Sequence, residues 1–300
     1  MSTHPPDGAP PVPGAEAGAV DPARDRVLVT PEALRRELAA GEGPALLDVR
    51  WTLAEPDGRP AYAAGHLPGA VYVDLETELA APPSRERGRH PLPTLDHLVT
   101  CARRWGLRDG QRVVVYDDVG GLSAARAWWL LRWGGAASVR ILDGGLSGWA
   151  ASGGELERGV REVVPGDVTL AGGRLPIIDI DEASWWPLRG TLLDARSADR
   201  FRGEVEPVDA RAGHIPGAVN APATDCLAPD GRFLPAAELR ERFGALGVAR
   251  ASYSAAYCGS GVTACHLIAA LASIGQPAVL YPGSWSQWAG DPERPVEPVS

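Results

Sequence analysis

Lysine is absent from this 300-residue chain, in which all 29 basic side chains are arginines. Without a side-chain amine, the chain cannot form a Schiff base with pyridoxal phosphate. It also cannot supply the lysine of a P-loop, of a protein kinase or of a Ser-x-x-Lys hydrolase. These enzyme classes are excluded before any motif is considered.

Long apolar runs and excess positive charge are also missing. No stretch approaches the roughly 18 apolar residues of a membrane helix, and the first residues, MSTHPPDGAPPVPGAEAG, lack the cationic start and apolar core of a signal peptide. The net charge is −9, which disfavours nucleic acid or an anionic membrane as partner. We therefore expect a cytoplasmic protein with neither kind of partner.

Cysteine is scarce, and its spacing indicates no metal site. The four residues form no Cys-x-x-Cys pair and have no histidines at zinc-ligand spacing. In a reducing cytoplasm they should be free thiols, and most should act as small buried apolar side chains. They are Cys101, Cys226, Cys258 and Cys265.

An internal repeat organises the chain. LLDVR at 46–50 recurs as LLDAR at 192–196, and AGHLPGAV at 64–71 recurs as AGHIPGAV at 212–219. VYD at 115–117 matches AYC at 256–258, and LDGG at 142–145 matches YPGS at 281–284. Several landmarks in one order at nearly one offset predict a duplicated domain of about 120 to 130 residues.

Each half alternates short β-rich runs with longer helical patterns, which predicts an α/β fold with a mostly parallel sheet flanked by helices. We expect a disordered segment at 1–25, a first domain at 26–150, a linker at 151–176, a second domain at 177–290 and a tail at 291–300. Expected strands include 113–116, 139–142, 191–193, 254–257 and 278–281, and expected helices include 31–40, 123–133, 236–243 and 263–274. Three tryptophans on one predicted helix, Trp128, Trp129 and Trp133, are interpreted as packing residues.

The halves differ where chemistry is expected. Cys258 stands where the first half has Asp117, between a predicted strand and a predicted helix, at the sheet edge where α/β proteins form their sites. The loop CGSGVTA at 258–264 can turn backbone N–H groups toward one anion, and the helix N-terminus adds partial positive charge. Cys258 is thus predicted to be a nucleophilic thiolate.

Arginine gives a second contrast. Arg50 and Arg196 follow the repeated aspartate in both halves, which favours a shared structural pairing. Arg200 has no such counterpart, because Ala54 occupies the matching position. We therefore interpret Arg200 as a binder of an anionic substrate.

The chain resembles the tandem-domain rhodaneses over about residues 27–290. These are the thiosulfate and 3-mercaptopyruvate sulfurtransferases. The resemblance rests on the two Asp-x-Arg motifs, the two Gly-His-Leu/Ile-Pro-Gly-Ala motifs, the cysteine loop and YPGSW at 281–285. The resemblance implies two rhodanese-like domains, the first inactive and the second catalytic. It implies a ping-pong reaction without external cofactor or metal, in which Cys258 takes sulfur from a small anionic donor as a persulfide. A thiol or cyanide then removes the outer sulfur of the persulfide. A protein such as thioredoxin is not excluded as the acceptor.

The resemblance also implies roles for individual residues. Amides of the loop, from Gly259, Gly261, Val262 and Thr263, would hold the thiolate and then the persulfide. Arg200 matches the family arginine that binds the donor anion, and Trp51 matches an aromatic residue of the pocket. In the mercaptopyruvate branch a serine, a histidine and an aspartate form a relay; Ser260 and His66 match the first two. Asp57 is the candidate aspartate, with Glu55 as a rival. Packing in a repeated turn remains an equal alternative for His66.

One departure bears on the donor. The mercaptopyruvate branch carries a second donor-binding arginine in Glu-Pro-Arg-Asp, whereas 206–209 here reads EPVD, with Val208 in its place. Loss of that contact would cost on the order of 1.5 to 3 kcal/mol, unless Arg211 replaces it. Thiosulfate is therefore the expected donor, and 3-mercaptopyruvate is the alternative.

Two other functions are compatible with a cysteine at this position of the fold. Cysteine phosphatases of this fold need an arginine six residues after the nucleophile, and Ala264 occupies that position. A non-catalytic sulfur carrier or interaction module is the remaining alternative, against which Cys258, its loop and Arg200 argue.

Overall fold

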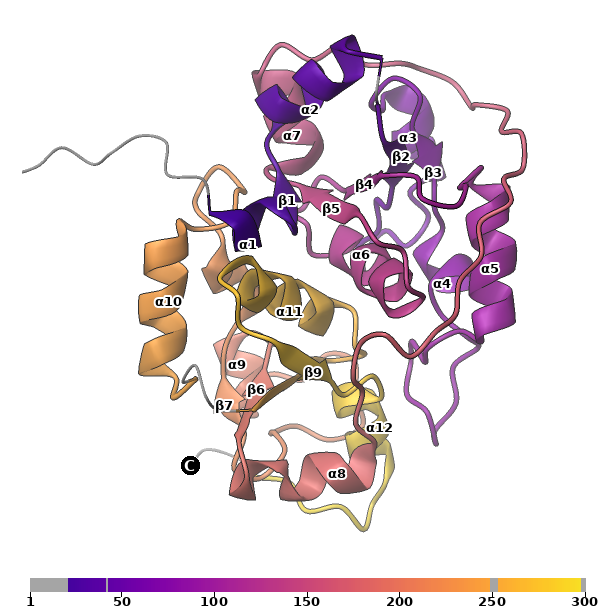
Figure 1. The fold of residues 1–300 in the computed structure, drawn as a ribbon. Coiled ribbons are helices and arrows are strands. Elements are labelled where there is room, and N and C mark those ends of the chain that lie inside the picture. Colours follow the sequence, from indigo (N-terminus) through magenta and orange to yellow (C-terminus); the bar gives the residue numbers. More distant parts are fainter. Residues whose placement is uncertain (1–20, 42, 249–252, 298–300) are drawn as a thin grey trace, which may run out of the picture.

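Two α/β domains, each built on a small parallel sheet, follow one another along the chain (Figure 1). The structure is a computed structural model that describes residues 21–41, 43–248 and 253–297. The first sheet has the order β1-β5-β4-β2-β3, and the second has the order β7-β6-β8-β9. The strands are β1 (Leu28–Val29), β2 (Ala45–Asp48), β3 (Val71–Tyr72), β4 (Val113–Tyr116), β5 (Val139–Leu142), β6 (Thr191–Asp194), β7 (Val219–Asn220), β8 (Ser254–Tyr257) and β9 (Ala278–Leu280).

The duplication predicted from the repeats is visible in the strand register. Asp48 of β2 lies opposite Tyr116 of β4, and Asp194 of β6 lies opposite Tyr257 of β8. Each aspartate binds the arginine two residues on: Asp48 pairs with Arg50 at 2.8 Å and Asp194 with Arg196 at 2.6 Å. The shared structural pairing expected for both arginines is therefore confirmed.

Helices flank both sheets (Figure 1). In the first domain they are α1 (Pro22–Asp25), α2 (Pro31–Ala39), α3 (Arg59–Ala64), α4 (Leu75–Glu78), α5 (Leu95–Arg104), α6 (Ala124–Trp133) and α7 (Gly145–Ala151). In the second they are α8 (Ile180–Trp185), the 3-10 turn η1 (Trp186–Leu188), α9 (Ala198–Phe201), the 3-10 turn η2 (Ala223–Cys226), α10 (Ala236–Ala245), α11 (Thr263–Ser273) and α12 (Ser284–Gly290).

Local sequence explains where the central helices lie. α2 begins at Thr30, whose hydroxyl accepts the N–H of Ala33, and Pro31 occupies its first turn, as helix starts prefer. α11 has the sequence TACHLIAALAS and is buried on nearly all sides. A helix that is apolar all round belongs inside a protein, and α11 packs between its own sheet and α6 of the first domain.

One hydrophobic core crosses the domain boundary along α6 and α11. Trp128 and Trp129 of α6 share a buried cluster with Leu267 and Ile268 of α11, and Trp129 stacks on Trp133. The packing role expected for these tryptophans is confirmed. Because the core is continuous, the two domains present a fixed junction where a site can form.

The expected segment boundaries shift at both ends. Residues 1–20 of the segment expected to be disordered lie outside the described part, but residues 22–25 form α1, where Arg24 binds Asp143 at 2.9 Å. Of the tail, residues 291–297 are described, and Glu297 pairs with His214 through backbone hydrogen bonds. The linker leaves α7 and runs along α5, where the N–H of Gly166 donates to the carbonyl of Arg103 (Figure 1). Among the described helices, none is both long and apolar enough to cross a membrane.

Candidate active site

Cys258 lies in the turn between β8 and α11, at the carboxyl edge of the second sheet. Its side chain is buried, and its Sγ accepts a hydrogen bond from the N–H of Gly261 at 3.1 Å. The turn requires glycine at 261, because φ is +80° and a Cβ there would lie 2.5 Å from the carbonyl oxygen of Pro282. The thiol therefore sits in a tight loop at the N-terminus of an 11-residue helix.

The segment 281–286 braces this loop from behind. The N–H of Cys258 donates to Ser284 Oγ, and the N–H of Trp285 donates back to the carbonyl of Cys258. The N–H of Ser286 donates to the carbonyl of Gly259. Ser284 has a positive φ of 54°, a strained conformation for a non-glycine residue. The YPGSW motif thus fixes the position of the nucleophile.

The equivalent turn of the first domain already encloses a carboxyl group. Asp117 is fully buried, and its carboxylate accepts four backbone N–H groups, from Val119, Gly121, Ser123 and Ala124, at 2.8–3.0 Å. Burial raises the pKa of Asp117, and these hydrogen bonds oppose that rise. The duplicated turn therefore has a backbone suited to a negative group at this position.

The predicted pairing of Ser260 with His66 is wrong. His66 stacks on Tyr62 at 3.9 Å, its Nδ1 lies 2.9 Å from the carbonyl oxygen of Tyr62, and its Nε2 faces Glu157 of the linker. Asp57 is exposed and pairs with Arg59, while the rival Glu55 is exposed and forms a local turn with Thr52.

The reason lies in the repeated turn itself. His214, the counterpart of His66, stacks on Phe201 and bonds its carbonyl in the same way. The histidine of the motif is thus a structural part of each turn, and neither His66 nor His214 reaches the thiol loop.

A different histidine contacts Ser260. His90 Nδ1 lies 2.7 Å from Ser260 Oγ, and His90 Nε2 lies 3.1 Å from Glu76 Oε1. Trp51 Nε1 also donates to Glu76, at 2.8 Å, and its ring packs edge-on against His90. Burial lowers the pKa of His90, while Glu76 opposes that shift. A neutral His90 can accept the Ser260 proton while donating to Glu76, which is the arrangement of a hydroxyl–imidazole–carboxylate relay.

The sequence contains a signal that would have identified His90. Gly88-Arg89-His90 matches Gly231-Arg232-Phe233 in the second half at an offset of 143 residues, within the range of the other repeats. His90 thus differs between the halves in the same way as Cys258, because Phe233 occupies its position in the second half.

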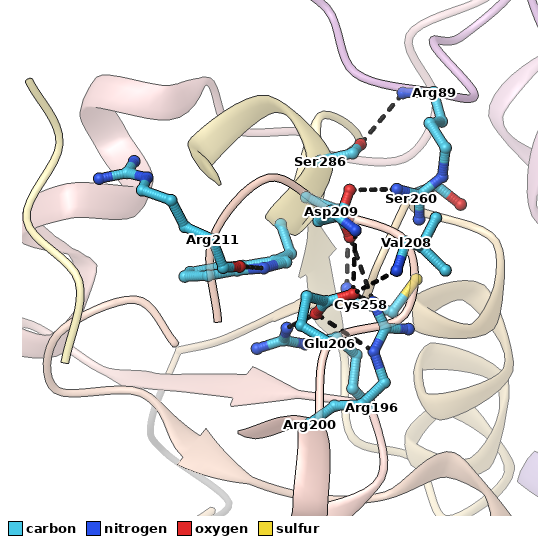
Figure 2. Close-up of polar contacts among 12 residues, drawn as sticks. Arg89, Arg196, Arg200, Glu206, Val208, Asp209, Arg211, Cys258, Ser260 and Ser286 are labelled. Carbon is cyan, nitrogen blue, oxygen red and sulfur yellow. Dashed lines mark hydrogen bonds and ion pairs between the residues drawn. The ribbon is translucent and has the colours of Figure 1, made fainter. Parts of the chain in front are cut away.

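Arg200 lies in the cavity, as expected, but carboxylates accompany it. Its Nη2 contacts Glu206 at 2.7 Å and Asp209 at 3.2 Å, and Arg196 Nη1 also lies 3.4 Å from Glu206 (Figure 2). Burial raises the pKa of Asp209, while Arg89 and Arg200 oppose that shift. Much of the positive charge of these arginines is therefore balanced within the protein.

Arg211 does not replace the cation missing at Val208. It points away from Cys258 (Figure 2), and its guanidinium donates to the backbone carbonyls of Trp288, Ala289, Asp291 and Arg294. The possibility raised for Arg211 is thus wrong, because the residue fixes α12 and the chain after it.

A buried cation underlies the junction of the domains. Arg126 of α6 is 0 % exposed and donates to the carbonyl oxygens of Gly261 and His90, and to those of Leu79 and Pro91. In the described part of the chain no carboxylate is among the groups that act on its charge, and burial lowers its pKa. Arg126 therefore holds the thiol loop and the relay histidine together.

These groups surround a cavity of about 340 Å³ between the domains. The first domain contributes Trp51 and Arg89 to its lining, and the second contributes Arg200, Cys258 and Ser260. Gly259, Val262 and Thr263 line it as well. Within residues 21–41, 43–248 and 253–297, no three histidine, cysteine or acidic side chains are grouped as metal ligands would be. The cavity offers a thiol, a relay and guanidinium groups, which suit nucleophilic chemistry on a small anion.

Comparisons with known proteins agree with this chemistry. A family model described as the rhodanese-like domain matches residues 30–152 and 178–291. A Mycobacterium tuberculosis protein named "Putative thiosulfate sulfurtransferase SseB" is 49% identical over 280 residues, covering 91% of this chain and 98% of that protein. A Pseudomonas aeruginosa protein named "Probable 3-mercaptopyruvate sulfurtransferase" is 49% identical over 260 residues, covering 84% and 91%.

A solved structure shows the same architecture. SseA from Escherichia coli, one of the 3-mercaptopyruvate sulfotransferases, superposes with a TM-score of 0.75 at 33% identity, covering 86% of this chain and 98% of that one. Relatives of equal identity carry the names of different donors, so identity alone does not distinguish the donor.

Proposed function

The chain belongs to the rhodanese family and is a sulfurtransferase of that fold, and from this premise we propose that its principal donor is 3-mercaptopyruvate. Cys258 takes the donor sulfur as a persulfide and passes it to a thiol or to cyanide. This reverses the order of donors expected from the sequence. We place the reaction in the cytoplasm, where thiol acceptors are reduced.

The contact between Ser260 and His90 carries the proposal. When sulfur leaves thiosulfate, the leaving group is sulfite, a stable anion that needs no proton. When sulfur leaves 3-mercaptopyruvate, a carbon–sulfur bond breaks and the enolate of pyruvate must be protonated. Ser260 Oγ lies 2.7 Å from His90, in a hydroxyl–imidazole–carboxylate relay beside the nucleophile. Such a relay transfers protons, which only the reaction with 3-mercaptopyruvate requires.

The first half-reaction then balances without a cofactor. The Cys258 thiolate attacks the donor sulfur, a sulfur–sulfur bond forms, and the carbon–sulfur bond breaks with its electron pair moving to the enolate. Ser260 accepts the proton of the donor thiol and passes its own to neutral His90, which becomes an imidazolium beside Glu76. The proton returns by the same route to C3 of the enolate, giving pyruvate. The cysteine sulfur is oxidised to the persulfide level and the donor carbon is reduced to a methyl group.

Backbone amides stabilise the anion at each stage. Gly261 N–H already bonds Cys258 Sγ, and the N-terminus of α11 favours negative charge at the loop. The four N–H groups that hold the Asp117 carboxylate in the equivalent turn support the same role for the amides of Gly259, Val262 and Thr263 toward the persulfide.

In the second half-reaction, an acceptor thiolate or cyanide attacks the outer sulfur of the persulfide and regenerates the Cys258 thiolate. Thioredoxin is a protein acceptor of suitable chemistry, because it carries reactive thiols. Thiosulfate is the second candidate donor, favoured by the relative named for it and by the guanidinium groups of the cavity.

The test is a mass measurement paired with donor kinetics. Incubation with 3-mercaptopyruvate should add about 32 Da, one sulfur atom, to Cys258 and release one equivalent of pyruvate, and kcat/KM should exceed that for thiosulfate. Cys258→Ser should lose the added mass, whereas Cys226→Ser should keep it, because Cys226 is buried away from the cavity. No added mass with either donor would mean that the protein is a non-catalytic module.

A further inference from the structure

The indole of Trp51 contacts the carboxylate end of the relay. Trp51 lies just after β2, and its Nε1 donates to Glu76 Oε1 at 2.8 Å. His90 Nε2 lies 3.1 Å from the same oxygen and 3.2 Å from Glu76 Oε2. The Trp51 ring also packs edge-on against His90, with the ring centroids 5.5 Å apart. Trp51 therefore contacts both the carboxylate and the imidazole of the relay.

Glu76 has little else to fix its orientation. It belongs to α4, a helix of four residues, and its side chain is 42 % exposed, whereas that of His90 is 5 % exposed. A glutamate loses rotamer freedom when it is held in one orientation, which makes a lone exposed ion pair weak. A second donor on the same carboxylate offsets that loss. Among the described residues, Trp51 and His90 are the two whose side chains hydrogen-bond to this carboxylate, so the indole is what holds Glu76 toward His90.

The turn around Asp117 holds Trp51 in turn. Ser123 belongs to this turn, where its N–H donates to the Asp117 carboxyl group at 2.8 Å. The Ser123 hydroxyl is buried and donates to the carbonyl oxygen of Trp51 at 2.7 Å. The counterpart of the thiol loop thus anchors the residue that holds the relay. A series of hydrogen-bonded residues connects the two turns: Asp117, Ser123, Trp51, Glu76, His90 and Ser260.

We propose that Trp51 is a positioning residue for sulfur transfer from 3-mercaptopyruvate, whose indole N–H keeps Glu76 in contact with His90. The proposal rests on the proposed function, because only this donor requires the relay. In such a relay the carboxylate orients the imidazole and stabilises the imidazolium. Trp51 thus has two separable parts. Its ring lines the cavity, whereas its N–H acts on proton transfer through Glu76.

Glu76 also influences the charge of His90. The groups that face His90 are Glu76 of α4, Arg126 of α6, Arg89 of its own loop and the hydroxyl of Ser260. Burial and the two arginines lower the pKa of His90, whereas Glu76 raises it. Release of Glu76 into solvent would therefore lower the pKa of His90 further. Any acidic decline of the rate that reflects protonation of His90 would then move to lower pH.

Trp51→Phe tests the proposal, because it removes the N–H and keeps an aromatic ring. With 3-mercaptopyruvate, kcat should fall about 10- to 100-fold, the loss expected for one charge-assisted hydrogen bond. KM should change only a few-fold, and the acidic decline of kcat should move to lower pH. With thiosulfate, whose leaving group needs no proton, both constants should change only a few-fold.

The same helix offers a matched control. Trp105 Nε1 donates to Glu78 Oε2 at 3.1 Å, two residues along α4 from Glu76 and outside the lining of the cavity. Trp105→Phe therefore removes the same kind of indole–carboxylate bond without touching the relay. It should leave kcat and the pH profile unchanged with both donors.

A double-mutant cycle shows whether the indole acts through Glu76. Glu76→Gln should lower kcat with 3-mercaptopyruvate, and Trp51→Phe added to it should cause little further loss, because both changes disrupt one contact. Should Trp51→Phe fail to fold, Trp51→Leu provides the same cycle, since leucine also lacks a donor.

Independent, additive losses in the double variant would overturn the proposal. So would unchanged kcat and an unchanged pH profile in a folded Trp51 variant. An equal loss with both donors would also overturn it, since that is the result of a misshapen cavity. Failure of the wild-type protein to release pyruvate would instead refute the proposed function, so the two failures are distinguishable.

Discussion

Replacing Ser260 by alanine should separate the two donors. The substitution removes the hydroxyl that lies 2.7 Å from His90 Nδ1 and leaves Cys258 and Gly261 in place. General acid–base catalysis contributes roughly 10²- to 10⁴-fold, or about 3 to 5 kcal/mol of activation free energy. With 3-mercaptopyruvate, kcat/KM should fall by such a factor. With thiosulfate, whose leaving group needs no proton, it should change only a few-fold.

Two assays measure the effect on the same preparation. Pyruvate formation reports on 3-mercaptopyruvate, and thiocyanate formation in the presence of cyanide reports on thiosulfate. The wild-type rate with 3-mercaptopyruvate should also decline in acid, because protonated His90 cannot accept a proton. Burial lowers the pKa of His90, so this decline should come at a lower pH than for an exposed imidazole. Ser260→Ala should lack this decline.

Ser197→Ala is the control, because Ser197 lines the same cavity and makes no hydrogen bond with His90. It should change neither donor more than a few-fold. Equal losses with both donors in Ser260→Ala would show that the hydroxyl merely shapes the loop. Full activity with 3-mercaptopyruvate would refute the relay.

Two further predictions concern stability. Gly261→Ala should lower the free energy of unfolding by about 1 to 3 kcal/mol and abolish persulfide formation, because its Cβ would meet Pro282. Gly110 is the control, since it also has a positive φ but no atom close to its Cβ position. Gly110→Ala should lose stability without losing activity. Burial lowers the pKa of His266 to about 4, so the unfolded chain binds a proton between pH 6.5 and 4 that the folded chain does not. As the pH is lowered across that window, the free energy of unfolding should therefore fall by about 3 kcal/mol. Urea titrations should show a smaller fall for His266→Gln.

The fold could be read from the sequence because its signals are local. The apolar runs of β4 and β8 and the cap of α2 specify their elements without reference to the rest of the chain. The repeat then supplied the arrangement. Cys258 was found in the same way, since a substitution between two copies of one turn is visible in a single sequence.

The residues around the nucleophile are harder to predict from the sequence, because contacts between domains leave no regular spacing of residues along the chain. His90 lies 170 residues from Ser260, and Arg89 reaches Asp209 across 120 residues. The sequence around His66 is distinctive, but that distinctiveness belongs to a structural turn. Arg211 was close in sequence to the missing cation and proved to point elsewhere.

The buried Arg126 has a consequence for how the enzyme is made. The loop that carries Cys258 is synthesised after Arg126, His90 and Glu76, which belong to the first half of the chain. Domains fold as units during synthesis, N-terminal first. The first half can thus present Arg126 and His90 as an internal template when the thiol loop emerges, while the core that α6 shares with α11 forms only after both halves are made. The domain that carries Asp117 in place of the cysteine is thus the assembly platform for its twin.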